Sequence, residues 1–270
     1  MKATPFDELL PTDIRAVSAD DGSFEFPVLP NGEWVLSAET QSSGAKVRGF
    51  TEAHLAGRDL DRVELHLSMP FTLRGSVSLE GSDGRRLDKK IAIFLRPSVG
   101  ASEGLPQGIP DQDGAFKIEN VYPGRYKIVA VSPGPPYFLE SILMGDREIL
   151  GQNVELLSSA LPVKIIFESK GGGVRGTVED CGSATVVLMP QDNALREPQF
   201  VQTTSCAEAG RFEMTNIRPG DYYAFAFDPW EGPAALISGF DQSLFNKAVT
   251  AHVQKGEVLT IDLRVTAANP

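Results

Sequence analysis

Short segments of alternating apolar and polar residues run along the whole chain, and one pair of segments occurs three times. In each copy a Gly is followed two residues later by a Phe, ten residues later by a second Gly and twelve residues later by an aromatic residue. The copies run from Gly22 to Trp34, from Gly114 to Tyr126 and from Gly210 to Tyr222. Because alternation places apolar side chains on one face of a strand, each copy predicts an antiparallel hairpin with one buried face.

The apolar positions predict which side chains are buried. The first strand of each hairpin buries Phe24 and Phe26, Phe116 and Ile118, or Phe212 and Met214. The second strand buries Trp34, Leu36 and Ala38, or Tyr126, Ile128 and Ala130, or Tyr222, Ala224 and Ala226. A further alternating strand follows each hairpin, over residues 63–67, 163–167 and 259–265. The second glycines, Gly32, Gly124 and Gly220, are expected to supply a positive φ at the turn within each hairpin.

The spacing of the copies predicts separate small domains. Gly22 and Gly114 are 92 residues apart, and Gly114 and Gly210 are 96 apart, which is too long for a solenoid repeat. We therefore expect domains at residues 1–70, 71–170 and 171–270, called here the first, second and third repeats. Short linkers are expected at residues 69–70 and 169–173, and the glycines of the second linker favour flexibility.

The second and third repeats open with similar Gly-containing strands, over residues 73–77 and 174–178. The first repeat has no such strand before Gly22, so we expect the sequence to begin inside a longer protein. A unit of about 100 residues with about seven short strands is typical of an immunoglobulin-like sandwich. The expected fold class is all-β, with tandem immunoglobulin-like or prealbumin-like antiparallel β-sandwich domains. A few helical turns are expected near residues 239–247.

Composition narrows the range of partners. The chain of 270 residues carries 36 acidic and 25 basic side chains, with a formal net charge of -11. This negative charge argues against nucleic acid or an anionic membrane surface as a partner. No apolar run approaches the roughly 18 residues of a membrane-spanning helix, and the first residues of this sequence lack the apolar stretch of a signal peptide.

Three short motifs together resemble the carboxypeptidase regulatory-like domain. In the second repeat they are Leu73-Arg74-Gly75-Ser76-Val77, Asp113-Gly114-Ala115-Phe116 and Pro123-Gly124-Arg125-Tyr126. In the third they are residues 174–178, Gly210-Arg211-Phe212 and Pro219-Gly220-Asp221-Tyr222. Two positions depart from the pattern. In the third repeat Ala209 replaces the Asp of the first turn, and in the first repeat Asn31 replaces the Pro of the second turn. The resemblance covers nearly all of residues 71–265 and implies a transthyretin-like (prealbumin-like) β-sandwich.

The resemblance also implies a function. Domains of this family are non-catalytic modules of secreted or cell-envelope bacterial proteins, so we expect a structural, spacer or interaction role outside the cell or in the envelope, and no enzyme activity. The implied partners are neighbouring domains of a longer chain, a polysaccharide or an envelope protein. Carbohydrate binding is the alternative function, since related sandwiches bind starch. No cofactor is expected.

Two cysteines, Cys181 and Cys206, both fall in the third repeat. Cys181 follows the opening strand and Cys206 precedes the Gly210 turn, so strands that alternate in direction would bring the two thiols to one end of the sandwich. We expect a disulfide worth roughly 3 kcal/mol in the loop-entropy model. The alternative is two free thiols in a reducing compartment.

Candidate ligand-binding residues are few. Trp230 and Tyr137 lie in corresponding Pro-bounded loops, and Tyr223 lies on the strand face opposite Tyr222. These rings could stack on a sugar, or they could cap the sandwich or pack on a neighbouring domain. The three histidines, His54, His66 and His252, show no metal-ligand spacing, and no nucleophile motif occurs. The Asp residues before Gly22 and Gly114 fit turn chemistry better than calcium binding.

Overall fold

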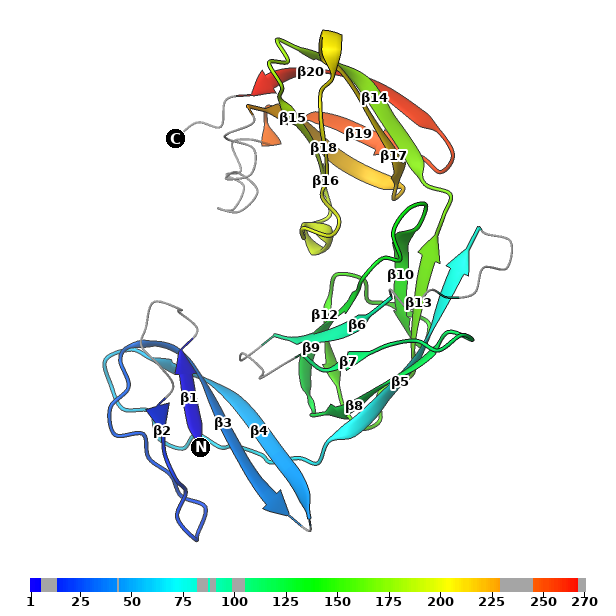
Figure 1. Cartoon of the computed structure of the whole chain (residues 1–270). Helices are drawn as coiled ribbons and strands as arrows, with labels where there is room; N and C mark the ends of the chain where they lie inside the picture. The colour runs from blue at the N-terminus through cyan, green and yellow to red at the C-terminus, as the bar shows by residue number, and fades with distance from the viewer. Residues whose placement is uncertain are drawn as a thin grey trace. The chain divides into compact units, whose positions relative to one another are not determined.

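The computed structural model describes residues 1–5, 14–42, 44–81, 87, 91–98, 105–228 and 245–266. Within these residues the regular structure is almost entirely β-strand, which confirms the all-β fold class (Figure 1). Two short 3-10 helices, Asn193–Leu195 and Glu208–Gly210, complete it. Most of the helical segment expected near residues 239–247 lies outside the described residues.

Strands of the first repeat form one antiparallel sheet. They are β1 (Lys2–Pro5), β2 (Ile14–Arg15), β3 (Gly32–Ser42) and β4 (Ala45–Leu55), in the spatial order β2-β1-β3-β4. Strands β3 and β4 form a hairpin that pairs from Gly32 with Leu55 to Ser42 with Ala45. Trp34, Leu36, Ala3 and Ala53 are buried in a small apolar cluster on this sheet.

Strands of the second repeat form two sheets, in the orders β11-β10-β13-β5-β8 and β12-β9-β6-β7. The strands are β5 (Phe71–Glu80), β6 (Ile93–Pro97), β7 (Gln107–Gly108), β8 (Ala115–Val121), β9 (Gly124–Ala130), β10 (Phe138–Met144), β11 (Arg147–Glu148), β12 (Asn153–Leu156) and β13 (Val163–Glu168). Each sheet buries alternate residues, as the sequence pattern predicts: Phe116 and Ile118 in β8, and Tyr126, Ile128 and Ala130 in β9. The predicted hairpin is wrong, because β8 pairs with β5 in one sheet and β9 pairs with β6 and β12 in the other.

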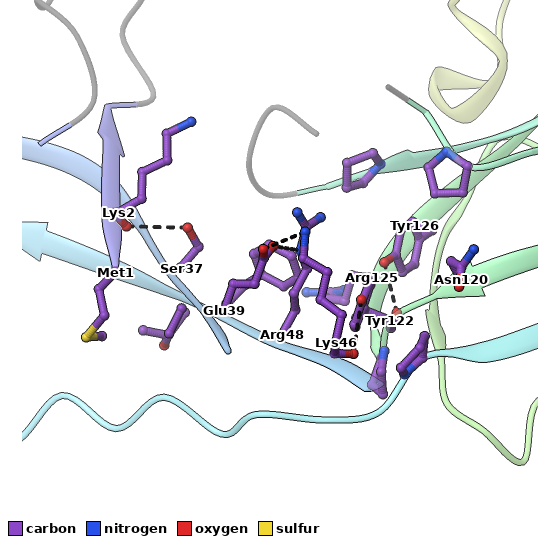
Figure 2. Close-up of a pocket in the computed structure, with 18 of the residues that line it drawn as sticks. Met1, Lys2, Ser37, Glu39, Lys46, Arg48, Asn120, Tyr122, Arg125 and Tyr126 are labelled. Carbon is purple, nitrogen blue, oxygen red and sulfur yellow. Dashed lines mark hydrogen bonds and ion pairs between the residues drawn. The ribbon is translucent and has the colours of Figure 1, made fainter. Parts of the chain in front are cut away.

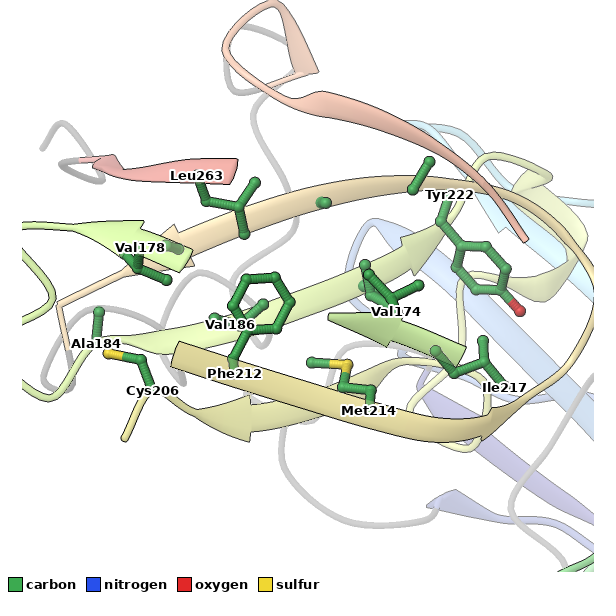
Figure 3. Packing of buried hydrophobic residues seen from close by; sticks show 14 of the residues in the cluster. Val174, Val178, Ala184, Val186, Cys206, Phe212, Met214, Ile217, Tyr222 and Leu263 are labelled. Carbon is green, nitrogen blue, oxygen red and sulfur yellow. The ribbon is translucent and has the colours of Figure 1, made fainter. Parts of the chain in front are cut away.

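Strands of the third repeat form a seven-stranded sheet in the order β16-β15-β18-β20-β14-β17, with β19 paired to β18. They are β14 (Gly172–Glu179), β15 (Thr185–Pro190), β16 (Gln202–Ser205), β17 (Arg211–Ile217), β18 (Gly220–Phe227), β19 (Val249–Val253) and β20 (Val258–Thr266). Strand β14, the first strand of the repeat, runs parallel to the last strand, β20, and antiparallel to β17. The predicted hairpin of this repeat is wrong too, because β18 pairs with β15, β19 and β20 and not with β17. One apolar cluster fills the interior, with Val174, Phe212, Met214, Tyr222 and Leu263 among its members (Figure 3).

Compact packing divides the chain into two units that differ from the three sequence repeats. The first unit contains Met1–Ser76, Ile91–Val131 and Leu143–Lys164, and the second contains Val77–Lys90, Ser132–Ile142 and Ile165–Pro270. The predicted domain boundaries at residues 70 and 170 stay predictions.

The glycine of each opening strand, β5 or β14, lies beneath the Phe that follows the first turn. Gly75 pairs with Phe116, and Gly176 pairs with Phe212. A Cβ atom at Gly75 would overlap the Phe116 ring and the carbonyl oxygen of Val163, and one at Gly176 would overlap the carbonyl oxygen of Ile261. The residue must therefore be glycine because the backbone of the last strand and an aromatic ring leave no room for a side chain.

The first turn of each repeat has the same backbone hydrogen bonds. In the third repeat the N–H of Ala207 donates to the carbonyl of Arg211, and the N–H of Gly210 donates to the carbonyl of Ala207. Residues 19–23 and 111–115 make the same two bonds. The side chain of Asp111 accepts hydrogen bonds from the N–H groups of Asp113 and Ala115, at 3.0 and 2.9 Å. This carboxylate closes a turn, in agreement with the turn-chemistry interpretation.

The prediction of two strands in the first repeat is wrong. Residues 24–26 and 63–67 form no strand, although Phe24, Phe26, Val63 and Leu65 still pack against the apolar cluster of that repeat. The equivalent segments of the other repeats pair with an opening strand, β5 or β14, whereas these two have no neighbouring strand among the described residues. Apolar alternation places a segment on a core but does not supply its ladder of hydrogen bonds.

Two predictions about glycines are also wrong, namely a positive φ at Gly124 and a flexible role for the linker glycines. Gly32 and Gly220 have φ values of 140° and 151°, but Gly124 does not have a positive φ. The linker glycines Gly172 and Gly173 form the start of β14, and a Cβ at Gly172 would overlap the carbonyl oxygen of Gln254. Close packing against neighbouring backbone, and not flexibility, therefore accounts for glycine at this position.

Replacing Gly176 by Val should destabilise the third repeat by roughly 1 to 3 kcal/mol, because the added side chain overpacks the space between β14 and β20. The measurement is urea unfolding of the full chain. Arg175→Ala, at the neighbouring exposed position, is the control and should change the stability by no more than about 0.5 kcal/mol. An unchanged unfolding midpoint for Gly176→Val would contradict the close packing described above.

Candidate functional site

The polar tips of three repeated aromatic residues make the same hydrogen bond. The Trp34 indole N–H donates to the Pro30 carbonyl at 2.9 Å, and the Tyr222 hydroxyl donates to the Arg218 carbonyl at 2.7 Å. The Tyr126 hydroxyl likewise donates to the Tyr122 carbonyl at 2.8 Å. In each case the acceptor lies four residues before the donor, on the other side of the second turn. The hydrogen bond therefore connects the residue before the turn to the strand that carries the buried ring. This arrangement resembles the tyrosine corner of immunoglobulin-like sandwiches.

Burial sets the ionisation of the two tyrosines. Burial raises the pKa of Tyr222 to about 12, helped by the Glu140 carboxylate and opposed by the Arg218 guanidinium. Burial also raises the pKa of Tyr126, although the hydrogen bond to Tyr122 and the charge of Arg48 oppose the rise. Both hydroxyls are therefore protonated donors across the physiological pH range.

The structure joins Cys181 and Cys206 by a disulfide. Cys206 is buried and Cys181 is half-buried against the apolar cluster of the third repeat. The N–H of Cys206 donates to the carbonyl of Ala184, and the N–H of Ala184 donates to the carbonyl of Cys181. The bridge thus lies at the end of the sandwich where β14 and β16 approach their turns, and it closes a loop with a sequence separation of 25 residues.

The three proposed sugar-stacking residues are not assembled into one platform by the described structure. Tyr137 is 8% exposed, so its ring is not presented to solvent. Tyr223 is half-buried on the outer face of β18, where its ring centroid lies 4.7 Å from that of Phe245. Trp230 lies outside the described residues. Sugar binding by these rings stays a prediction.

Tyr223 belongs to a second apolar cluster on the outer face of β15 and β18. Val187, Met189, Phe225 and Phe227 are its buried members. The guanidinium of Arg196 lies 4.5 Å from the Phe245 ring centroid and 5.6 Å from that of Tyr223, and it donates to the carbonyls of Pro190 and Gln191. The Arg196 side chain therefore holds the segment after β15 against this outer face.

A pocket of about 1150 Å³ lies within the first compact unit (Figure 2). Strands β3 and β4 contribute Glu39, Lys46 and Arg48, and the turn before β9 contributes Tyr122 and Arg125. The Glu39 carboxylate pairs with Lys46 at 2.5 Å and also with Arg48. Arg48 lies 5.5 Å from the Tyr122 ring centroid, and the Tyr122 hydroxyl donates to the Lys46 carbonyl at 3.3 Å.

The charged groups of this pocket mainly neutralise one another. The hydrogen bond from Lys46, and next that from Arg48, lower the pKa of Glu39 below its usual range. Glu119, at the rim, is paired with Lys117 at 2.7 Å, and this hydrogen bond lowers the pKa of Glu119. A general base or acid needs a pKa near the operating pH, whereas both carboxylates are held in the ionised form. The arrangement suits a polar contact surface better than proton transfer.

Histidines of the chain lie on exposed strand positions or loops. His54 lies 2.5 Å from Glu33, and His252 lies 2.7 Å from Asp221. Each pair joins residues directly opposite on neighbouring strands. No group of three or more His, Cys, Asp or Glu side chains that could hold a metal ion occurs among the described residues. No helix in the described part of the chain is long and apolar enough to cross a membrane.

Sequence reasoning missed a buried carboxylate, Glu168, at the end of β13. Glu168 is 7% exposed and accepts hydrogen bonds from Lys255 at 2.6 Å and from the N–H groups of Ser169 and Lys170. Burial alone would raise the pKa of Glu168, but these hydrogen bonds outweigh burial and lower it. Lys255 is remote in sequence, so no local signal could have identified the pair.

Comparisons with known proteins give only distant likenesses. No family model and no curated protein sequence matches the chain. A Streptococcal ancillary pilin structure matches with a TM-score of 0.33 and 13% identity, covering 94% of this chain and 80% of that one. GBS52, the minor pilin of the Gram-positive pathogen Streptococcus agalactiae, matches with a TM-score of 0.35 and 10% identity, covering 74% and 98%. The Bacillus anthracis TIE protein matches with a TM-score of 0.27 and 13% identity, covering 97% and 46%. These likenesses are too distant to carry an argument about function.

The buried Tyr222 hydroxyl makes the third repeat sensitive to alkaline pH. Since the pKa is about 12 in the folded chain and about 10 when unfolded, the unfolded state binds fewer protons between these values. The stabilisation is complete below about pH 10 and is lost as the pH rises towards 12. Tyr222→Phe should reduce this pH dependence and lower the stability at pH 7 by roughly 0.5 to 1.5 kcal/mol.

Urea unfolding between pH 7 and 12 measures both effects, with tyrosinate absorbance as a second readout. Tyr223→Phe, at the adjacent position on the other strand face, is the matched control and should keep the wild-type pH slope. A Tyr222→Phe variant with the same slope as the wild type would show that this hydroxyl is not the buried group.

Removing the disulfide should destabilise the third repeat by roughly 3 kcal/mol. The measurement is urea unfolding of the wild type with and without a reductant, beside a Cys181→Ala, Cys206→Ala double variant that a reductant should not affect. Two reactive thiols, counted under denaturing conditions in protein taken from its native compartment, would contradict the bridge.

Proposed function

We propose that this chain is a non-catalytic structural and interaction module, part of an array of β-sandwich domains in a secreted or cell-envelope bacterial protein. The observation that carries the proposal is the structural role of the repeated glycine and aromatic residues. Glycines of the opening strands admit neighbouring backbone, and the repeated aromatic tips close turns. The repeated residues therefore build the interiors and close the turns, which supports a structural role.

The parallel pairing of β14 and β20 suits a role under tension. Seven residue pairs join the two strands, from Gly173 with Val258 to Glu179 with Arg264. On their outer face Thr177 donates to Asp262 at 2.6 Å, and Arg264 pairs with Glu179. Force applied at the start of β14 and the end of β20 pulls the parallel strands past each other, so all seven pairs resist together.

A disulfide supports an oxidising location. Structural disulfides persist in secreted and envelope compartments and are rare in the cytosol. The bridge between Cys181 and Cys206 fits that chemistry. Carbohydrate binding by Trp230, Tyr137 and Tyr223 has no supporting observation in the described residues, and we do not propose it here.

Single-molecule stretching tests the structural role. With handles beyond residues 171 and 266, the third repeat should unfold at a higher force than with handles at residues 171 and 257. The second geometry is the control, because it opens the same ladder one pair at a time from its start. Equal forces in the two geometries would contradict the proposal.

The same stretching experiment also detects the disulfide between Cys181 and Cys206. Reduction should release the loop between the cysteines and lengthen the unfolding step by about 85 Å, given a separation of 25 residues and an extended length of about 3.4 Å per residue.

A further inference from the structure

Among the described residues one charged side chain is buried, and it lies where the second repeat leads into the third. Glu168 is the last residue of β13, and residues 169–171, called here the connecting segment, join it to β14. Exposed segments of small and polar residues are preferred sites of proteolytic cleavage. Lys170, in the middle of the connecting segment, is exposed and offers such a site to a trypsin-like protease.

The Glu168 carboxylate ties the connecting segment to the third repeat. Its Oε1 atom accepts hydrogen bonds from the N–H groups of Ser169 at 2.8 Å and Lys170 at 3.0 Å. Its Oε2 atom accepts a hydrogen bond from the ammonium of Lys255 at 2.6 Å, and Lys255 lies in the turn between β19 and β20. This hydrogen bond raises the pKa of Lys255, so the ammonium stays charged.

Backbone hydrogen bonds extend the attachment to the same turn. The N–H of Gly256 donates to the carbonyl of Gly171 at 3.1 Å, and the N–H of Gly173 donates to the carbonyl of Glu257 at 2.8 Å. All of these residues belong to the second compact unit. The connecting segment therefore lies along the turn between β19 and β20, and the Glu168 carboxylate is bonded at its beginning.

The end of β5 holds the other side of the connecting segment. The N–H and the hydroxyl of Ser169 both donate to the carbonyl of Glu80, each at 3.2 Å. A Cβ atom at Gly81 would overlap the Glu168 carboxylate and the Ser169 hydroxyl. Glycine at this position therefore leaves the space in which the carboxylate meets its donors.

We propose that Glu168 and Lys255 form a latch that keeps the connecting segment closed and withholds the peptide bond after Lys170 from proteases. This inference goes beyond the proposed structural role, because it assigns a protective function to one charge pair. A protease cuts a stretch of backbone that has first opened locally, so the rate of cleavage follows the population of the open form. Since one carboxylate binds three donors, the loss of its charge weakens all three hydrogen bonds together.

Trypsin digestion of the full chain tests the latch, with cleavage of the Lys170–Gly171 bond followed by mass spectrometry. Glu168→Gln keeps the shape and removes the charge, and it should speed the initial cleavage of this bond by about tenfold or more, as should Lys255→Met. Lys255→Arg should be cleaved there as slowly as the wild type, because a guanidinium also donates to a carboxylate. Glu257→Gln is the matched control: it removes an exposed carboxylate from the same turn and should leave the rate unchanged.

Hydrogen exchange distinguishes an open latch from an unfolded repeat. In Glu168→Gln the amides of Lys170 and Gly256 should exchange faster by about tenfold or more, whereas those of β14 and β20 should keep their wild-type protection.

Three results would overturn the proposal. The first is cleavage after Lys170 in the wild type as fast as in an unfolded peptide of the same sequence. The second is a Glu168→Gln variant that is cleaved there at the wild-type rate. The third is faster cleavage together with lost protection in β14 and β20, which would show that the pair stabilises the whole repeat and does not act as a latch. None of these results depends on the stretching comparison, so the structural role is tested separately.

Discussion

One hydrogen bond, from a buried aromatic tip to a carbonyl four residues earlier, organises each repeat of this chain. Trp34, Tyr126 and Tyr222 all make it. The ring belongs to the core, the acceptor lies before the second turn, and the second glycine lies between them. The bond therefore fixes the corner at which the strand that carries the ring begins. An indole N–H replaces the hydroxyl in the first repeat without changing the geometry, because only a donor at the end of a large ring is required.

The glycine of the opening strand complements this aromatic corner. At Gly176 the chain approaches both Phe212 and the carbonyl of Ile261, so the absence of a side chain lets three strands lie close together. Burial of the apolar cluster provides the main stabilisation, but the corner and the glycine decide which residues face it. The first repeat has the corner, and within its described residues the segments at 24–26 and 63–67 do not form strands.

Much of the fold could be predicted because the relevant signals are local. Alternation identified the buried residues of β8, β9, β17 and β18, and turn residues located the corners between these strands. The predicted hairpins are wrong because the two strands at each corner pair with other strands and not with each other. Errors arose where structure depends on distant partners. The segments at 24–26 and 63–67 need a neighbouring strand to form a ladder. Glycine is needed at position 172 because the backbone of Gln254 lies close to it. The buried Glu168 carboxylate pairs with Lys255, which is remote in sequence. Tyr137 follows prolines in sequence, yet it is buried, since loop composition does not determine which way a ring turns. The aromatic corners had a readable signal in the constant spacing between the ring and the residue before the turn.

The central claim is that the Trp34 indole N–H and the Tyr126 and Tyr222 hydroxyls are buried donors held in hydrogen bonds. Proton NMR of the full chain at neutral pH tests this directly, because a hydroxyl or indole proton that is buried and bonded exchanges slowly with water. We expect slowly exchanging hydroxyl resonances for Tyr126 and Tyr222 and a protected indole resonance for Trp34, each lost singly in the Tyr126→Phe, Tyr222→Phe or Trp34→Phe variant. Hydroxyl protons that exchange too fast to be observed, and an indole proton that exchanges as in a free peptide, would contradict the account.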